Sequence, residues 1–224
     1  MRGEFIGWWR RSWNHWDFPK AAPIPKPVPG KKGKKFGITW WGQKWIKLVE
    51  SKGDEKRMAR GRAYARAERV FDIRLEKGNL SAKVEGSLGD YSVDISFKTH
   101  TKKRWERIIK NINNSPEVLG VLLNNEMPLN IEEICGVSLI PESFESKCSC
   151  PDWVNPCKHI AALYYVLADE IDKAPQILFK LQGIEPEALF ELLSSKRILL
   201  KTTKVHKSKR KNKSKRKISK KIKK

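Results

Sequence analysis

The sequence predicts an α+β fold: a small antiparallel β-meander covered by helices, with a metal-binding segment that leads into a buried helix. Three observations support this prediction. Three short segments between residues 70 and 97 alternate apolar and polar side chains and are separated by glycine-containing turns. The flanking segments repeat apolar residues at helical spacing. Three of the four cysteines and one of the four histidines fall within positions 148–159.

The first helix is expected over Thr39–Glu50, with Trp41, Trp45 and Leu48 on one side. The three predicted strands follow, and an antiparallel sheet covered on one side should show one apolar and one polar face. From Lys102 the apolar period becomes helical again, which predicts helices that cover this sheet. The remaining expected elements are the strands Val70–Leu75, Leu80–Val84 and Tyr91–Phe97, the helices Pro116–Leu123, Ile131–Cys135, Pro175–Leu181 and Pro186–Leu193, and a short strand at Val137–Ile140.

The two ends of the chain differ in composition from its middle. The net charge is +22, and residues 196–224 contain 16 lysines and arginines and no acid, which leaves only +6 for the rest. Such a run is expected to be disordered when free. We therefore expect a Trp-rich head with a Pro/Lys-rich linker over 1–35, a folded domain over 36–195 whose cysteine-containing segment lies at about 137–170, and a Lys/Arg-rich tail over 196–224.

The head contains a cluster of tryptophans. Trp9, Trp13 and Trp16 fall at i, i+4 and i+7, so a short helix would place them on one face. This face either packs on the domain, inserts into a groove of a partner protein, or stacks on bases. Because tryptophan and arginine dominate interface hot spots, these three residues are the predicted protein-interaction site.

The segment Arg57–Arg69 is strongly basic, and no acid interrupts it up to residue 67. A helix would place three of its arginines on one face, and a loop bent at Gly61 would also cluster them. A solvated face is the alternative to a phosphate-binding surface, for which the bidentate guanidinium is well suited. The predicted nucleic-acid contacts are Arg57, Arg60, Arg62, Arg66 and Arg69, together with Lys209, Arg210, Lys211, Lys215, Arg216 and Lys217 of the tail.

The strongest chemical signal is a set of metal ligands. Cys148, Cys150, Cys157 and His159 form a CxC pair and a CxH pair with six residues between them. Closed structural zinc sites use four tetrahedral thiolate and imidazole ligands, and the prolines and asparagine of the spacer favour the turn that brings two pairs together. We therefore expect one structural Zn²⁺ held by these four residues.

A helix is expected directly after the spacer. Pro156 suits its first turn, because proline lacks the N–H that is unsatisfied there. The positive end of the helix dipole would also favour thiolates at this point. The residues that recur on one apolar face of this helix are Ile160, Leu163, Tyr164 and Leu167.

Ordinary buried thiols, a disulfide and a catalytic zinc site are the alternatives for this cluster. A disulfide is disfavoured because the sequence shows no cleavable secretory signal. Catalytic sites usually offer three protein ligands and keep one position open, whereas four are present here. The nearby acids Glu142, Glu145 and Asp152 are interpreted as solvated loop charges, and Cys135 as a core residue.

The stretch C-S-C-P-D-W-V-N-P-C-K-H-I-A-A-L-Y-Y-V-L-A resembles the SWIM zinc finger in the form seen in stand-alone prokaryotic proteins. The resemblance extends from F-G-I-T-W-W-G-Q-K-W at Phe36 through R-M-A-R-G-R-A-Y-A-R, V-E-G-S and N-N-E-M-P to L-F-K-L-Q-G, or about residues 36–193. It implies zinc binding by the four ligands and a role with DNA or protein partners, such as helicases or recombination factors. It implies no catalytic residue, and it does not explain the head or the tail.

We therefore expect a non-enzymatic zinc protein that binds DNA or RNA. No P-loop, GxSxG, HExxH or GxGxxG motif is present, and no apolar run is long enough to cross a bilayer. The expected location is cytoplasmic, with the nucleoid or the ribosome as possible sites. An adaptor for a helicase or recombination factor and a ribosomal-RNA-associated protein are the alternatives, and a zinc hydrolase is a distant one.

Overall fold

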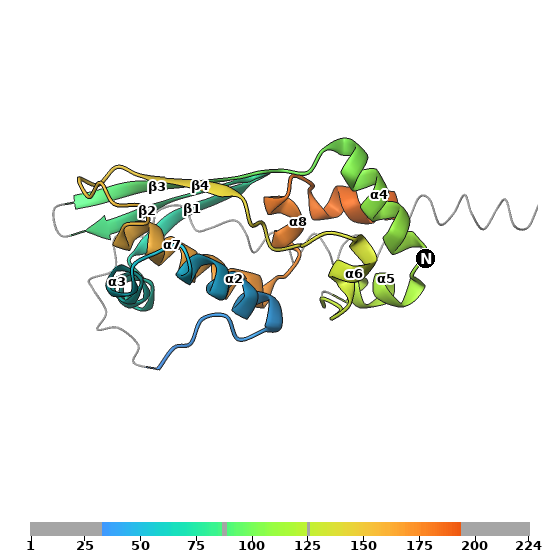
Figure 1. The fold of residues 1–224 in the computed structure, drawn as a ribbon, viewed down its shortest axis with the longest axis horizontal. Coiled ribbons are helices and arrows are strands. Elements are labelled where there is room, and N and C mark those ends of the chain that lie inside the picture. The colour runs from blue at the N-terminus through green and yellow to red at the C-terminus, as the bar shows by residue number, and fades with distance from the viewer. Residues whose placement is uncertain (1–32, 87–88, 125, 194–224) are drawn as a thin grey trace, which may run out of the picture. The chain divides into compact units, whose positions relative to one another are not determined.

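The computed structural model describes residues 33–86, 89–124 and 126–193 (Figure 1). The predicted protein-interaction residues Trp9, Trp13 and Trp16 and the predicted contacts over 209–217 lie outside the described residues. The described residues form two compact units: those up to Thr99 and Leu139–Gly183 form one, and those of His100–Ser138 and 184–193 form the other. The first unit is therefore discontinuous in sequence.

The first unit is built on a four-stranded antiparallel sheet. Its strands are β1 (Val70–Glu76), β2 (Asn79–Gly86), β3 (Gly89–Phe97) and β4 (Phe144–Cys148), in the order β1-β2-β3-β4. The predicted meander is confirmed. The predicted strand at Val137–Ile140 is wrong: that segment is a loop, and the fourth strand begins four residues later.

The two faces of the sheet differ as the alternation predicts. Val84, Val93 and Ile95 are fully buried on the inner face, whereas Lys83 and Asp94 point outward and are exposed. The edge strand β1 contains an irregularity between Phe71 and Arg74, where the register with β2 shifts. The inner face therefore belongs to the core, and the outer face is polar.

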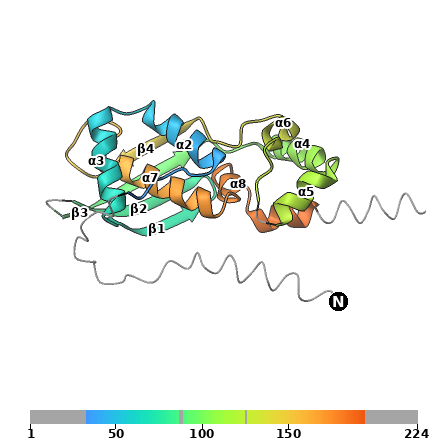
Figure 2. The same cartoon turned by 90° about the horizontal axis from the view of Figure 1, so that it is seen from below.

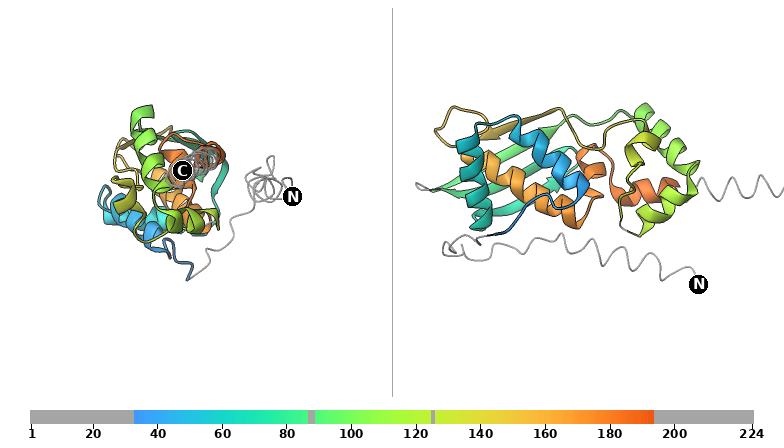
Figure 3. Two further views of the ribbon diagram at one scale, coloured as in Figure 1. Left: turned by 90° about the vertical axis from the view of Figure 1, so that its right-hand side faces the viewer. Right: turned by 60° about the horizontal axis from the view of Figure 1, so that its bottom comes forward.

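Among the described residues, four helices belong to this unit: α2 (Trp40–Glu50), α3 (Glu55–Arg66), α7 (Lys158–Lys173) and α8 (Ile177–Leu181). Helix α7 lies against the inner face of the sheet, and α2 and α3 pack on α7 (Figures 2 and 3). Thr39 caps α2 by accepting the N–H of Gly42. The buried stripe of α2 is Gly42, Trp45 and Val49, whereas Trp41 and Leu48 of the predicted stripe are only half-buried.

Trp45 connects α2 to α7 and to the sheet. Its indole Nε1 donates a hydrogen bond to the carbonyl oxygen of Tyr164 at 2.9 Å, which satisfies the one polar group of a fully buried side chain. Its ring packs against Phe97 at 6.1 Å and Phe144 at 5.4 Å between centroids. The W-W-G-Q-K-W signature therefore contributes a core anchor.

The second unit contains α4 (Lys102–Asn113), α5 (Pro116–Leu123), α6 (Ile131–Cys135) and a helical segment at 186–193. All four were predicted. The expectation that helices after Lys102 cover the sheet is wrong for α4 to α6, because they belong to this second unit and α7 occupies the inner face of the sheet. Within the described ranges, no helix is long and apolar enough to span a membrane.

Candidate metal centre

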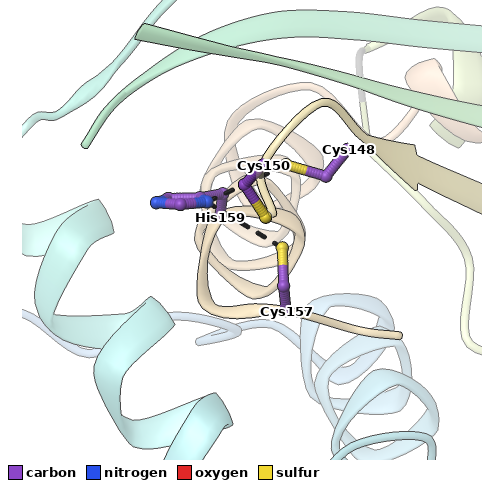
Figure 4. A group of neighbouring side chains, drawn as sticks. All are labelled: Cys148, Cys150, Cys157 and His159. Carbon is purple, nitrogen blue, oxygen red and sulfur yellow. Dashed lines mark hydrogen bonds between the residues drawn. The ribbon is translucent and has the colours of Figure 1, made fainter. Parts of the chain in front are cut away.

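The structure brings the four predicted ligands together. One ligand atom from each of Cys148, Cys150, Cys157 and His159 lies within 4.8 Å of the others. Figure 4 shows the three sulfur atoms and one imidazole nitrogen directed toward a common centre, where the end of β4 meets the start of α7. Two segments with different backbone conformations therefore converge on one point.

The CxC pair is positioned by the sheet. Cys148 ends β4 and pairs with Val93 of β3. The residue between the two cysteines, Ser149, extends this pairing: its N–H donates to the carbonyl of Ser92 at 3.0 Å, and its Oγ accepts the N–H of Ser92 at 2.9 Å. The CxC spacing therefore lets Ser149 hold β3 while the flanking thiols are directed to the metal centre.

The CxH pair is positioned by α7. Cys157 is the N-cap, with extended backbone, and His159 lies in the first turn. Pro156, which the sequence placed in that first turn, precedes the cap and is buried. The two ligands therefore lie where the positive end of the dipole of a helix of 16 residues favours negative sulfur.

The distances fit a tetrahedral zinc ion. The Nδ1 atom of His159 lies 3.8 Å from the sulfur of Cys148 and 3.9 Å from that of Cys157. Zinc–sulfur bonds of about 2.3 Å and zinc–nitrogen bonds of about 2.0–2.1 Å place such neighbouring ligand atoms about 3.6 Å apart in a tetrahedron. A set of three thiols and one imidazole at these separations is a closed structural zinc site, with Nδ1 as the histidine ligand.

The thiols differ in acidity before any metal is bound. The pKa of Cys157 is lowered to about 4, by hydrogen bonds from the thiol of Cys148, from His159 and from the N–H of Ile160. The pKa of Cys148 is raised, mainly because this thiol donates to Cys157 and also because it is desolvated. The sulfur of Cys157 is therefore the first to ionise, and a divalent ion would offset the charge of the remaining thiolates.

Two tyrosines enclose the histidine. The ring of Tyr91 lies 4.6 Å from the imidazole at 30°, and the ring of Tyr64 lies 5.6 Å away, edge on. The Nε2 atom of His159 is buried and has no hydrogen-bond partner within the described ranges. Ring packing therefore orients this ligand. Sequence reasoning missed Tyr91, although its place on the apolar face of β3 was the available signal.

The spacer between the two pairs is held by hydrogen bonds to β4 and within itself. Asn155 donates to the carbonyl of Ser146 at 2.7 Å and accepts from its hydroxyl at 3.0 Å, and the hydroxyl of Tyr164 lies 3.0 Å from the same Ser146 Oγ. Asp152 accepts the N–H of Val154 at 3.2 Å. Hydrogen bonds therefore fix the loop even apart from the metal.

Four of the predicted arginines of Arg57–Arg69 lie on α3 and Arg69 follows it, and their environments differ. Arg62 donates to Glu50 at 2.5 Å and to the hydroxyl of Tyr165 at 3.0 Å, and Arg66 donates to the carbonyl of Lys34. Arg69 lies over the ring of Tyr64 at 4.9 Å. All three arginines are therefore engaged by other groups of the first unit.

Arg57 and Arg60 are closer to the metal loop. The Nη2 atom of Arg57 lies 3.5 Å from a carboxylate oxygen of Asp152. The pKa of Asp152 is lowered, first by the N–H of Val154 and then by Arg57, with Arg60 contributing. Arg60 is exposed, and its Nε donates to the carbonyl of Lys56. Glu142 and Glu145 are exposed as well.

A closed Cys₃His site between a sheet and the start of a buried helix defines a structural zinc-finger protein. The family model of the SWIM zinc finger matches residues 121–168. The chain is also 33% identical over 185 residues to the uncharacterized protein Rv2102 of Mycobacterium tuberculosis, covering 77% of this chain and 67% of the relative. No solved structure matches. The chain belongs to the SWIM zinc finger family, and its four clustered ligands support one structural zinc ion.

Proposed function

We propose that this protein is a non-enzymatic nucleic-acid-binding protein, in which zinc shapes the finger and basic side chains contact phosphates. The observation that carries the proposal is the charge distribution. Sixteen lysines and arginines and no acid lie in residues 196–224. Each phosphate that such a segment neutralises releases condensed counterions, which gives affinity that depends strongly on salt and weakly on sequence.

The surface of the first unit supports a second contact. Among the arginines of α3, Arg60 is exposed and Arg57 is half-buried, with 27% of its side chain accessible. The ion pair between Arg57 and Asp152 joins two partly exposed groups, and exposed pairs contribute only about 0–1 kcal/mol. Exchanging Asp152 for a phosphate as the partner of Arg57 therefore costs little free energy. The outer face of the sheet offers no comparable basic surface, since acids such as Asp94 and Glu145 accompany its lysines.

The test measures how affinity depends on salt. The full-length, zinc-loaded chain is titrated into labelled single-stranded and duplex DNA and RNA at several salt concentrations. The measured quantity is the slope of the logarithm of the binding constant against the logarithm of the salt concentration. Replacing the six predicted tail contacts, residues 209–211 and 215–217, by glutamine should reduce the magnitude of this slope for single strands by about 4. The double variant Arg57→Gln, Arg60→Gln should reduce it by about 1.

Arg74→Gln is the matched control. Arg74 is 69% exposed but lies on the sheet, where it pairs with Asp72, so its loss should leave the slope unchanged. A parent chain that binds none of these polymers at low salt contradicts the proposal. Retention of a helicase or recombination factor by such a chain would favour the adaptor alternative, and co-sedimentation with ribosomal subunits alone would favour the ribosomal one.

A further inference from the structure

The loop between the two ligand pairs carries a tryptophan that the fold does not use. Trp153 is 92% exposed, the most exposed large apolar side chain among the described residues. By contrast, Trp45 and Trp105 are buried, and Trp40 and Trp41 are half-buried. A side chain of this size normally contributes to a core or an interface, and Trp153 contributes to no core.

This exposed ring is held on a well-anchored loop. Cys150 precedes it by three residues and Cys157 follows it by four, so the metal closes the loop on both sides. Within the loop, the side chain of Asp152 accepts the N–H of Val154, and Asn155 is bonded twice to Ser146. The backbone that presents Trp153 is therefore preorganised, which lowers the entropy lost when a ligand stacks on the ring.

Positive charge lies near the residue that precedes this ring. Arg57 and Arg60 occupy positions i and i+3 of α3, on one side of the helix, and the Nη2 atom of Arg57 lies 3.5 Å from a carboxylate oxygen of Asp152. Asp152 is the immediate neighbour of Trp153. An exposed aromatic ring on a loop that a guanidinium group contacts is a combination suited to unpaired nucleotides, because the ring can take a base and the arginines can take the phosphates.

On the basis of the proposed function, we infer that Trp153 is a stacking platform for bases of single-stranded nucleic acid, with Arg57 and Arg60 contacting the adjoining phosphates. A duplex does not offer a base face to this ring, because its bases already stack on each other. Stacking on an exposed ring also discriminates poorly among bases, since every base has a π-face. The site therefore selects strandedness rather than sequence.

The inference is tested on the full-length, zinc-loaded chain by fluorescence anisotropy with a labelled oligonucleotide of about 12 nucleotides. Trp153→Ala should weaken binding to the single strand about ten-fold, and Trp153→Phe should weaken it less. Binding to a duplex of the same length should stay within about two-fold, because phosphate contacts dominate there. Leu129→Ala is the matched control, since Leu129 is 82% exposed and its loss should change neither affinity.

An oligonucleotide of abasic sites separates stacking from charge. It keeps the phosphates and lacks the bases, so parent and Trp153→Ala should bind it equally. A second readout is tryptophan emission: the quenching that the single strand causes in the parent should exceed that in Trp153→Phe.

Unchanged single-strand affinity in Trp153→Ala overturns the inference while leaving the proposed function in place, and assigns the ring to a protein partner or to none. An equal loss of duplex binding overturns it as well. Absence of all nucleic-acid binding by the parent removes both proposals.

Discussion

Helices α3 and α7 pack against each other, yet they place different demands on their sequences. In α7, ten of the 16 residues are buried, including His159. In α3, three of the 12 residues are buried, namely Met58, Gly61 and Ala65. Helix α7 thus joins the zinc site to the core, whereas α3 buries only a narrow stripe of residues, and its arginines lie outside that stripe. The comparison separates residues that maintain the fold from residues available for binding.

The largest expected effect comes from breaking the metal end of α7. Cys157→Ser should abolish stoichiometric zinc binding and destabilise residues 136–170 by several kcal/mol, because metal binding is coupled to folding. Zinc content and hydrogen exchange of the finger measure this. Acidification should also release zinc, since protons compete for the same thiolates and imidazole. Cys135→Ala is the control, because Cys135 is buried in the second unit and its loss should leave zinc content intact. An identical melting curve with and without chelator would contradict the coupling.

The next effect tests how closely the two helices approach. A Cβ on Gly61 would come within 2.8 Å of the backbone of Ala161 and Ala162, so Gly61→Val should destabilise the chain by about 3 kcal/mol. Ala63→Val on the exposed side of α3 introduces the same β-branched side chain and should cost less than about 1 kcal/mol. Urea unfolding distinguishes them, and equal losses would show that the close contact is unimportant.

A smaller effect on stability is expected at the polar contact that side chains of α2, α3 and α7 share. The hydroxyl of Tyr165 donates to Glu50 at 2.7 Å and accepts from Arg62, so Tyr165→Phe should cost about 1 kcal/mol at neutral pH. Burial and the bond to Glu50 raise the pKa of Tyr165 from 10.0 to about 12. The neutral hydroxyl therefore favours the folded state below pH 10, and this contribution disappears as the pH rises through about 12. Denaturant curves should show parent and variant converging over that interval; a constant difference would argue against this assignment.

The smallest effect on stability is expected at Arg60. Arg60→Gln should change the free energy of unfolding by less than about 0.5 kcal/mol, because its side chain is exposed. Arg62→Gln should be more destabilising, since it leaves Glu50 and Tyr165 without their shared donor. Thermal melts of the two variants measure which arginine of α3 stabilises the fold. A larger loss of stability for Arg60→Gln than for Arg62→Gln would contradict this assignment.

The sequence predicted three of the four strands, most of the helices and the ligand set because these follow from local periodicity and spacing. It failed where a polar residue is buried. Strand β4 has Ser146 on its inner face, bonded to Asn155 and Tyr164, so its pattern lacks the apolar alternation that marks β1 to β3. The role of Gly61 also depends on a partner helix about 100 residues away in sequence, which no local pattern records. The same limit applies to Arg62, whose engagement with Glu50 required the tertiary structure.

The discontinuity of the first unit has a consequence for how the protein is made. Strands β1 to β3 leave the ribosome before residues 100–138 of the second unit, and α7 follows only afterwards. At synthesis rates of about 5–20 residues per second, the inner face of the meander waits several seconds for the helix that covers it. During that interval Val84, Val93 and Ile95 lack the apolar partner that buries them in the finished protein. The zinc ligands are translated in the same late segment, so metal capture and closure of the core coincide in time.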